Sequence, residues 1–297
     1  MSFKSRNFFI FLAAAAVLFM AAGLNVLLDP FDSFEARQQG RFEHSARIPI
    51  LMYHHFSDEG SPEVTISAEA FENQIKALSA AGYTTITFKE LRDYVNEGTP
   101  LPGRPVLITI DDGYMSVYDT AFPILQKYGM KATVFIIGVF FGKDLYKDNP
   151  YWRTIPHFGE AETMEMTASG VISIQSHSWN MHQYEPYEDE YREGALRMKG
   201  ESRKAYIEAL TADFGFAAAQ IENVTGNRPF VYSYPFGKST GLSESVLRSL
   251  GVEVTLTTVN GVSVIIKGAP RSLFGLKRLN VPGDMAAEEL LKMIGRA

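Results

Sequence analysis

The sequence predicts an α/β fold: a (β/α) barrel, distorted and incomplete, with a transmembrane segment at its N-terminus. From residue 48 onward, short apolar runs alternate with segments of helical periodicity, which is the pattern of a parallel sheet covered by helices. About 250 residues in that alternation match a single barrel. A doubly wound open sheet is the alternative, because periodicity alone does not separate the two folds.

The transmembrane segment is predicted from an uncharged stretch, Phe8–Leu28, which follows Lys4 and Arg6. About 20 apolar residues suffice to span a bilayer, whereas the apolar core of a signal peptide has about 7–15. Basic residues before the span keep that end in the cytoplasm, so the rest of the chain is expected outside the cell. A cleaved signal peptide, followed by secretion, is the alternative. The expected order is a cytoplasmic tip and anchor over residues 1–28, a tether over 29–46 and a catalytic domain over 47–297.

Each predicted strand is a short run of aliphatic, β-branched and aromatic residues. Consecutive strands are separated by stretches long enough for a helix, so the sheet is expected to be parallel. In chain order the predicted strands are Ile48–Tyr53, Val106–Ile110, Lys131–Ile137, Val171–Gln175, Phe230–Tyr234, Val252–Thr258 and Leu276–Val281.

The predicted helices are bounded by capping signals. Ser67 caps the first helix, and Gly82, Gly129 and Gly170 end the first three. In chain order the predicted helices are Ser67–Ala81, Ser116–Tyr128, Glu160–Ala168, Ser202–Val224, Ser243–Leu250 and Met285–Ile294. Both candidate folds place active residues at the carboxyl ends of the strands, so each chemical motif should directly follow a strand.

Composition narrows the classes of function. Hydrophobic residues make up 46% and charged residues 21%, which is typical of a globular protein. The formal net charge is -6 and there is no basic run, so no nucleic-acid partner is expected. The chain has no cysteine, so any metal site must use His, Asp and Glu.

The first motif is a pair of adjacent carboxylates, Asp111 and Asp112, at the end of the strand Val106–Ile110. Gly113 allows the chain to turn there, so the two carboxylates can take different roles at one site. Asp-Asp-Gly is also good turn chemistry, and a plain turn is the competing interpretation.

The second motif is a histidine pair, His177 and His182, that follows the strand Val171–Gln175. Residues five apart do not share a helical face, so the two rings can converge only if a loop bends between them. Histidine together with Asp or Glu is a ligand set for Zn²⁺ or a similar metal. Two unrelated surface histidines are the alternative.

Two weaker motifs also follow strands. One is the segment 232–237, after the strand Phe230–Tyr234, and the other is the pair His54 and His55 at the end of the first strand. A histidine at a strand end in a barrel is a candidate acid or base. The agreement of four polar groups with four strand ends carries more weight than any one motif.

Taken together, these segments resemble the polysaccharide deacetylase family, the fourth carbohydrate esterase family, over about residues 47–281. The histidine spacing and the early Tyr-His-His resemble its biofilm branch, which deacetylates poly-β-1,6-N-acetylglucosamine. The resemblance implies an enzyme that removes N-acetyl groups from a polysaccharide and uses one divalent metal ion, with zinc the first expectation. A peptidoglycan or chitin-type substrate and a catalytically silent carbohydrate-binding homologue are the alternatives. A metal-independent glycosidase is disfavoured, because it needs two separated carboxylates that flank the bond.

The resemblance also assigns roles to residues. It implies that Asp112, His177 and His182 bind the metal and that Asp111 is the general base. The backbone N–H of Phe236 falls where the family binds the oxyanion, and His54 matches the general acid proposed for the biofilm branch.

The sequence departs from the family at two places. Ser233 stands where most members have an arginine, and no late Leu-x-x-His segment is visible. The nearest late segment ends in Arg278, which is a candidate replacement for the missing arginine and a candidate substrate contact.

Aromatic residues crowd the predicted loops and are candidates for stacking on sugar rings. Trp179 and Tyr234 are the candidate substrate contacts nearest the motifs, and ordinary packing is the alternative use of such residues. The other loop aromatics are Tyr151, Trp152, Tyr184, Tyr187 and Tyr191.

Overall fold

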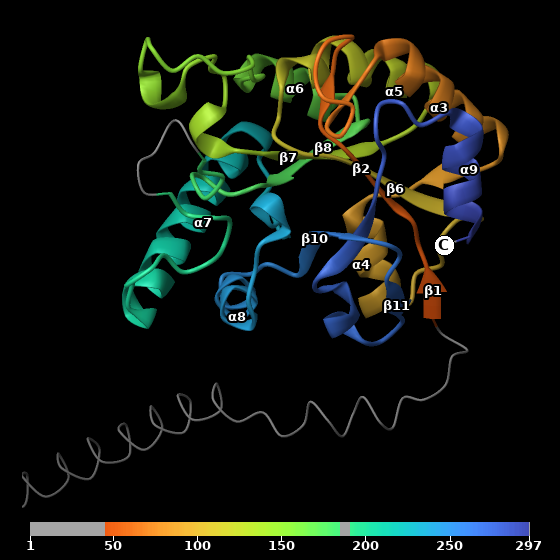
Figure 1. The fold of residues 1–297 in the computed structure, drawn as a ribbon. Coiled ribbons are helices and arrows are strands. Elements are labelled where there is room, and N and C mark those ends of the chain that lie inside the picture. The colour runs from red at the N-terminus through yellow and green to blue at the C-terminus, as the bar shows by residue number, and fades with distance from the viewer. Residues whose placement is uncertain (1–44, 185–190, 297) are drawn as a thin grey trace, which may run out of the picture. The chain divides into compact units, whose positions relative to one another are not determined.

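A closed ring of seven parallel strands forms the centre of the protein within residues 45–184 and 191–296, the residues that this computed structural model describes (Figure 1). The ring closes where β2 pairs with β6, from Ile50 opposite Leu107 to Tyr53 opposite Ile110. The barrel prediction is therefore confirmed, with seven strands in place of the usual eight, and the open-sheet alternative is wrong. Around the ring the strands are β2 (Ile50–Tyr53), β12 (Leu276–Asn280), β10 (Val254–Asn260), β9 (Val231–Ser233), β8 (Ile172–Ser176), β7 (Ala132–Ile136) and β6 (Pro105–Ile110).

The ring is irregular on one side. β8 and β9 are paired through a single residue pair, Ser176 with Tyr232. The register between β10 and β12 shifts between Leu256 and Asn260. All seven ring strands fall within two residues of the ranges predicted from the sequence, and these two weak junctions are the distortion of the barrel.

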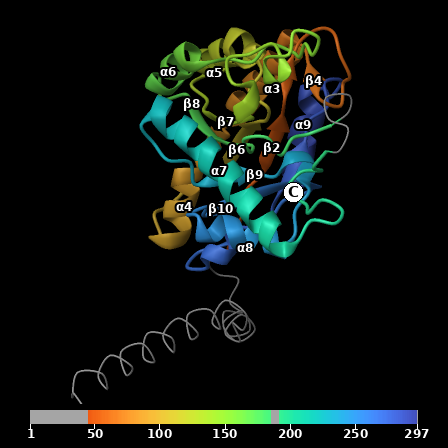
Figure 2. The same cartoon turned by 90° about the vertical axis from the view of Figure 1, so that its left-hand side faces the viewer.

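Helices cover the outside of the ring, as Figures 1 and 2 show from two directions. The outward-facing residues of β6, Val106, Ile108 and Ile110, belong to one large apolar cluster with buried residues of these helices. The six predicted helices are all present, although the helix predicted over 116–128 begins with a π-helical turn, Val117–Ala121. They are α3 (Ala68–Ala80), α5 (Phe122–Tyr128), α6 (Glu160–Ala168), α7 (Arg203–Thr225), α8 (Gly241–Ser249) and α9 (Ala287–Arg296).

A further helix, α4 (Phe88–Asn96), was not predicted. Its apolar residues, Phe88, Leu91 and Val95, are buried in a second cluster with Leu107 of β6 and Phe135 of β7. Side chains alternate along a strand, so Leu107 points to the opposite face of β6 from Val106 and Ile108, into the ring. α4 therefore packs against the interior layer at the amino ends of the strands, which leaves the carboxyl ends for the site.

Short elements complete the described fold. β1 (Ser45–Arg47) pairs antiparallel with β11 (Val264–Ile266), and β3 (His55–Phe56) pairs with β4 (Thr65–Ile66). β5 (Thr84–Thr85) pairs with the first two residues of β6. The 3-10 turns are η3 (Gly138–Phe140), η4 (Tyr146–Asp148), η5 (Pro235–Gly237) and η6 (Pro270–Leu273).

The residues from Ser45 onward form one compact unit, which begins two residues before the predicted domain boundary. The predicted anchor, Phe8–Leu28, lies outside the described residues, as does nearly all of the tether. Among the helices that the structure does describe, none has both the length and the apolar character that a membrane crossing requires.

Candidate active site

The two adjacent aspartates point to different partners because the chain turns between them. Asp111 continues the inward face of β6 that Leu107 and Thr109 occupy. Asp112 has φ 73° and Gly113 has φ 86°, both in the left-handed region. This turn, which costs a non-glycine residue about 1 kcal/mol or more, directs the Asp112 carboxylate away from that of Asp111.

Asp111 is held by Arg278 of β12. The guanidinium Nη1 donates to Oδ1 and Nη2 donates to Oδ2, both at 2.7 Å, which is the bidentate geometry of a strong ion pair. Nε of the same side chain donates to the carbonyl of Thr257, and the Ser233 hydroxyl lies 3.4 Å from Oδ2. Arg278 is 0% exposed. Arg278 therefore pairs with Asp111. The sequence analysis had named it as a candidate replacement for the arginine that most family members carry at the position of Ser233.

The ion pair sets the charge of Asp111. Burial alone would raise the pKa of this carboxyl, but the positive charge of Arg278, with a smaller effect of His177, outweighs burial and holds the pKa well below its usual range. Asp111 is therefore ionised at any physiological pH, in a fixed orientation.

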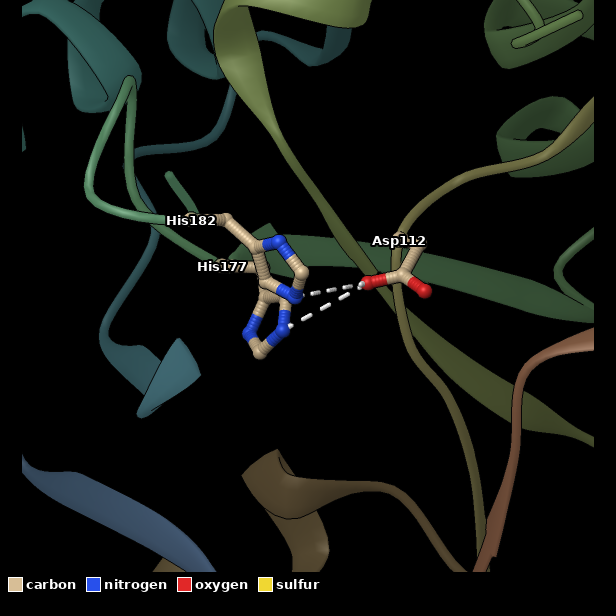
Figure 3. A group of neighbouring side chains, drawn as sticks. All are labelled: Asp112, His177 and His182. Carbon is tan, nitrogen blue, oxygen red and sulfur yellow. Dashed lines mark ion pairs between the residues drawn. The ribbon is translucent and has the colours of Figure 1, made fainter. Parts of the chain in front are cut away.

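The three predicted metal ligands converge at the carboxyl ends of β6 and β8 (Figure 3). Nε2 of His177 lies 3.6 Å from Oδ1 of Asp112, and Nε2 of His182 lies 3.8 Å from the same oxygen. One ligand atom from each of the three residues lies within 4.8 Å of the others. The loop between the histidines bends as the sequence analysis required, with Ser178 at φ 82°.

The chemistry of this group suits a divalent metal. Nδ1 of His177 is 2.8 Å from the carbonyl of Ser233, a contact that places the proton on Nδ1 and leaves Nε2 as an acceptor. Burial lowers the pKa of His182 to about 4, so its ring is neutral near pH 7. Oδ1 of Asp112 is buried and has no hydrogen-bond partner among the described residues. Two imidazole nitrogens and an unpartnered carboxylate oxygen are a donor set for zinc and similar ions.

His54 lies at the end of β2, close enough to both aspartates to lower the pKa of each by its charge. It is half-buried, as an acid that must reach a bound substrate should be. The neighbouring His55 instead faces Ser116, with its Nδ1 2.8 Å from the hydroxyl. The structure thus gives the two adjacent histidines different surroundings.

Phe236 follows β9 and is the second residue of η5, at φ 56°. Its ring lies against His182, with 4.1 Å between the ring centroids, and is 37% exposed. The backbone N–H groups at the start of a helical turn lack acceptors within that turn. Because the Phe236 ring contacts His182, the segment predicted to bind the oxyanion lies beside the three candidate metal ligands.

The predicted substrate contacts fare differently. Tyr234 is 0% exposed within a cluster that includes Tyr206 and Phe214 of α7, and Arg278 is fully buried against Asp111. Neither side chain is exposed at the surface of this structure, and their contact with substrate stays a prediction. The ring of Trp179 packs on Gly138, whose missing side chain makes room for it, and on Phe216 of α7. Tyr151, Tyr184 and Tyr191 are exposed, Trp152 is half-buried, and Tyr187 lies outside the described residues.

One buried histidine near the site was missed by the sequence analysis. His157 is stacked on Phe140, 4.9 Å between centroids, and contacts the ring of Tyr114. Burial lowers its pKa to about 4, and the charge of Asp112 partly offsets this. No strand end or motif precedes His157, so the sequence carried no signal for its position.

The chain is similar to known proteins over most of its length. It is 28% identical over 244 residues to a putative polysaccharide deacetylase, YxkH, of Bacillus subtilis, covering 82% of this chain and 75% of that one. It is 24% identical over 257 residues to the poly-beta-1,6-N-acetyl-D-glucosamine N-deacetylase of Escherichia coli K12, covering 80% of this chain and 37% of the relative. The chain thus spans well under half of the length of that second relative.

Solved structures share the fold. The de-N-acetylase from Aggregatibacter actinomycetemcomitans superposes with a TM-score of 0.71 at 20% identity, over 84% of this chain and 100% of that one. IcaB from Ammonifex degensii superposes with a TM-score of 0.67 at 24% identity, over 84% and 97%.

A family model described as polysaccharide deacetylase matches residues 98–255, more than half of the chain. The matched range contains both aspartates, His177, His182 and Phe236, whereas His54 and Arg278 lie outside it. The chain therefore belongs to the polysaccharide deacetylase family, as the sequence motifs indicated, and is an enzyme of that family.

Proposed function

We propose that this protein is a metal-dependent hydrolase that removes N-acetyl groups from an N-acetylglucosamine polysaccharide, with poly-β-1,6-N-acetylglucosamine favoured. One observation carries the proposal. At one end of the barrel, an ionised carboxylate locked by Arg278 stands beside a second carboxylate whose buried oxygen faces two imidazole nitrogens. A site with a fixed base beside a three-ligand metal group suits amide hydrolysis.

A divalent ion bound by Asp112, His177 and His182, with zinc the first expectation, would supply Lewis-acid activation of water and of the acetyl carbonyl. Asp111 accepts a proton from the attacking water. Its low pKa makes Asp111 a weak base, but the two hydrogen bonds from Arg278 keep its carboxylate ionised and in a fixed orientation. The oxygen of water adds to the acetyl carbon, and the backbone N–H of Phe236 donates a hydrogen bond to the carbonyl oxygen as negative charge develops there.

The C–N bond then breaks, and the nitrogen leaves with its electron pair. An amine is a poor leaving group until it is protonated, so an acid must reach it. His54 is the proposed donor because it stands beside both aspartates at the same end of the barrel. The products are acetate and a polymer that carries one free amine.

The choice of polymer rests on two supports. The early Tyr-His-His and the five-residue spacing of His177 and His182 are the features that resemble the biofilm branch. Relatives named poly-beta-1,6-N-acetyl-D-glucosamine N-deacetylase, from Escherichia coli and Staphylococcus aureus, align with 80% and 44% of this chain.

The test is acetate release by the full chain from poly-β-1,6-N-acetylglucosamine, chitin oligomers and peptidoglycan. Each reaction is run after chelation and again after Zn²⁺, Co²⁺ or Mn²⁺ is restored. Release from the first polymer that vanishes on chelation and returns with metal supports the proposal. Release from chitin or peptidoglycan alone would reassign the substrate, and release unaffected by chelation would refute the metal.

We also propose that residues 1–28 remain as a single-pass anchor, with the catalytic domain outside the cell. The basis is the uncharged stretch Phe8–Leu28 behind Lys4 and Arg6. Protease treatment of intact cells should degrade the membrane-bound protein. A shortened form in the medium would point to signal cleavage, and a protected form in the cytosol would refute export.

A further inference from the structure

The loop that joins the two histidine ligands has an unusual backbone. His177 and His182 are five residues apart, their ligand atoms lie close together, and Ser178 between them adopts φ 82°. A side chain with a Cβ disfavours this region, so something outside the loop must hold the conformation. The shape of this loop determines where the imidazole nitrogens lie.

The loop is held on one face by hydrogen-bond donors from η3. The backbone N–H of Gly138 donates to the carbonyl of Ser178, and the N–H of Val139 donates to that of Trp179, each at 3.0 Å. Within the loop, the Ser178 hydroxyl accepts from the N–H of Met181. These contacts account for the carbonyls of the bend but not for the N–H groups of Trp179 and Asn180.

Asp213 of α7 accepts those two N–H groups. Oδ1 accepts from Trp179 at 2.9 Å and Oδ2 accepts from Asn180 at 2.7 Å. Asp213 is only 8% exposed, and it lies on a helix of 23 residues that is capped by Ser202 and ends at Gly226. One side chain of α7 thus holds the middle of the loop, because each of its two carboxylate oxygens accepts a hydrogen bond from the loop backbone.

We propose that Asp213 is a positioning residue for the metal site: it fixes the backbone between His177 and His182 so that both imidazoles face Asp112. The inference rests on the metal site of the proposed function. Asp213 touches neither ligand ring, so its effect on the metal passes through the backbone of Trp179 and Asn180.

The choice of a carboxylate supports this role over simple packing. Asp213 is surrounded by an apolar cluster that includes Leu210 of the same helix and Phe214 next to it. Burial raises its pKa to about 6, so the charge is less favourable there than in water, although the carboxyl is still mostly ionised at pH 7. Two adjacent N–H groups need two acceptor oxygens, which a carboxylate provides and an amide does not.

The experiment compares the wild type with Asp213→Asn, which keeps the side-chain volume but replaces one acceptor with a donor. Zn²⁺ affinity is measured by chelator competition, and the Co²⁺-loaded protein is examined by its visible absorption spectrum. We expect Zn²⁺ binding to weaken about tenfold or more and the Co²⁺ bands to shift, because the ligand geometry changes. Wild-type affinity together with a wild-type spectrum would overturn the proposal.

Leu210→Ala is the matched control. It lies three residues earlier on α7, is fully buried in the same cluster, and makes no contact that holds the loop by a hydrogen bond. It should lower the Tm of the metal-free protein at least as much as Asp213→Asn, yet keep the wild-type affinity and spectrum. Equal loss of metal affinity in both variants would mean that general loosening of α7 is the cause, and the proposal would be rejected.

Hydrogen exchange of the metal-free wild type tests the same proposal without a substitution, so its result does not depend on whether a variant folds. The amides of Trp179 and Asn180 should exchange slowly before any metal is added, whereas rapid exchange there would contradict the proposal. Metal binding by two variants distinguishes a failure of the proposed metal site from a failure of the proposed role of Asp213. If His177→Ala leaves wild-type metal binding undiminished, the metal site of the proposed function is wrong and the inference falls with it; if only Asp213→Asn has no effect, the inference alone falls.

Discussion

At the scale of single residues, the site depends on how two neighbouring carboxylates are separated in role. Asp111 is bound by both arms of the Arg278 guanidinium, whereas Oδ1 of Asp112 has no hydrogen-bond partner in the described chain. The left-handed conformation at Asp112 produces this division. The same conservative substitution should therefore have one consequence at Asp111 and another at Asp112.

Asp111→Asn should retain the metal and lose turnover, by about 10²–10⁴-fold, because general-base catalysis is worth that much. Asp112→Asn should lose the metal itself. Elemental analysis and acetate release on both variants check this. Metal loss in Asp111→Asn with retained fold would show that the two roles are exchanged.

His54→Ala should lower kcat strongly and leave metal content and fold intact, because the leaving amine then lacks its proton donor. His55→Ala is the control, since His55 is engaged by Ser116 on the other side of the strand end. Acetate release and metal content are the measurements. An active His54→Ala beside an inactive His55→Ala would move the acid to the neighbour, and activity in both would place it elsewhere.

The buried ion pair makes a prediction about stability. Arg278→Gln leaves the Asp111 carboxylate buried without its counter-charge, which should lower the free energy of unfolding by about 3–5 kcal/mol. In the double variant Asp111→Asn/Arg278→Gln that charge is gone, so the loss should be clearly smaller than the sum of the single losses. Urea unfolding of the four proteins in chelator measures this, and additive losses would contradict a direct coupling.

The residues that the sequence identified are those whose motifs follow strands. Two strand ends and a bent loop suffice to bring an aspartate close to His177 and His182, and the family resemblance supplied the choice of Asp112 over Asp111 as the ligand. Arg278 was identified only as one of two alternatives, since its partner sits on a strand distant in sequence. The burial of Tyr234 and the place of His157 depend on packing around β9 and η3, which no local pattern encodes.

At the scale of elements, the strands were predictable because each is a continuous apolar run, and the missed helix α4 shows where that reasoning stops. α4 carries a complete capping box, in which Thr87 and Glu90 satisfy one another's backbone N–H groups, and this signal was present in the sequence. The helix is short and follows β5, a strand of two residues, so no clear strand separated it from the preceding helix.

The burial of Asp213 on α7 predicts a pH dependence of stability. The pKa of Asp213 is raised by burial to about 6 in the folded protein, above the usual value of 3.8. The folded state therefore binds this proton more tightly than the unfolded state. The stabilisation is fully present below about pH 4 and is lost as pH rises through about 6, by about 3 kcal/mol in total.

Asp213→Asn cannot titrate, so the difference in unfolding free energy between this variant and the wild type should change by most of that amount between pH 4 and pH 7. Urea unfolding in chelator across this range checks the sign and the size. A constant difference would mean that Asp213 keeps an ordinary pKa. Arg192 is the charged group that acts against the shift, so Arg192→Gln should enlarge it.

At the scale of the whole molecule, the barrel could be predicted but its closure could not. Alternation of strands and helices indicates parallel pairing, and the carboxyl ends of parallel strands meet at one edge, so the site location followed from either fold. The choice between a closed ring and an open sheet depends on whether β2 meets β6, a contact between strands more than fifty residues apart in the chain. No local pattern specifies that pairing.

The position of β12 in the ring has a consequence for the order of events during translation. β12 lies between β10 and β2, although it is the last of the seven ring strands to leave the ribosome. When the chain has reached Phe236, the metal ligands and the base have all been made, but the guanidinium that locks Asp111 has not. A growing chain therefore cannot assemble a competent site until β12 inserts between β10, made shortly before it, and β2, the first ring strand to be made, so activity arises late in synthesis.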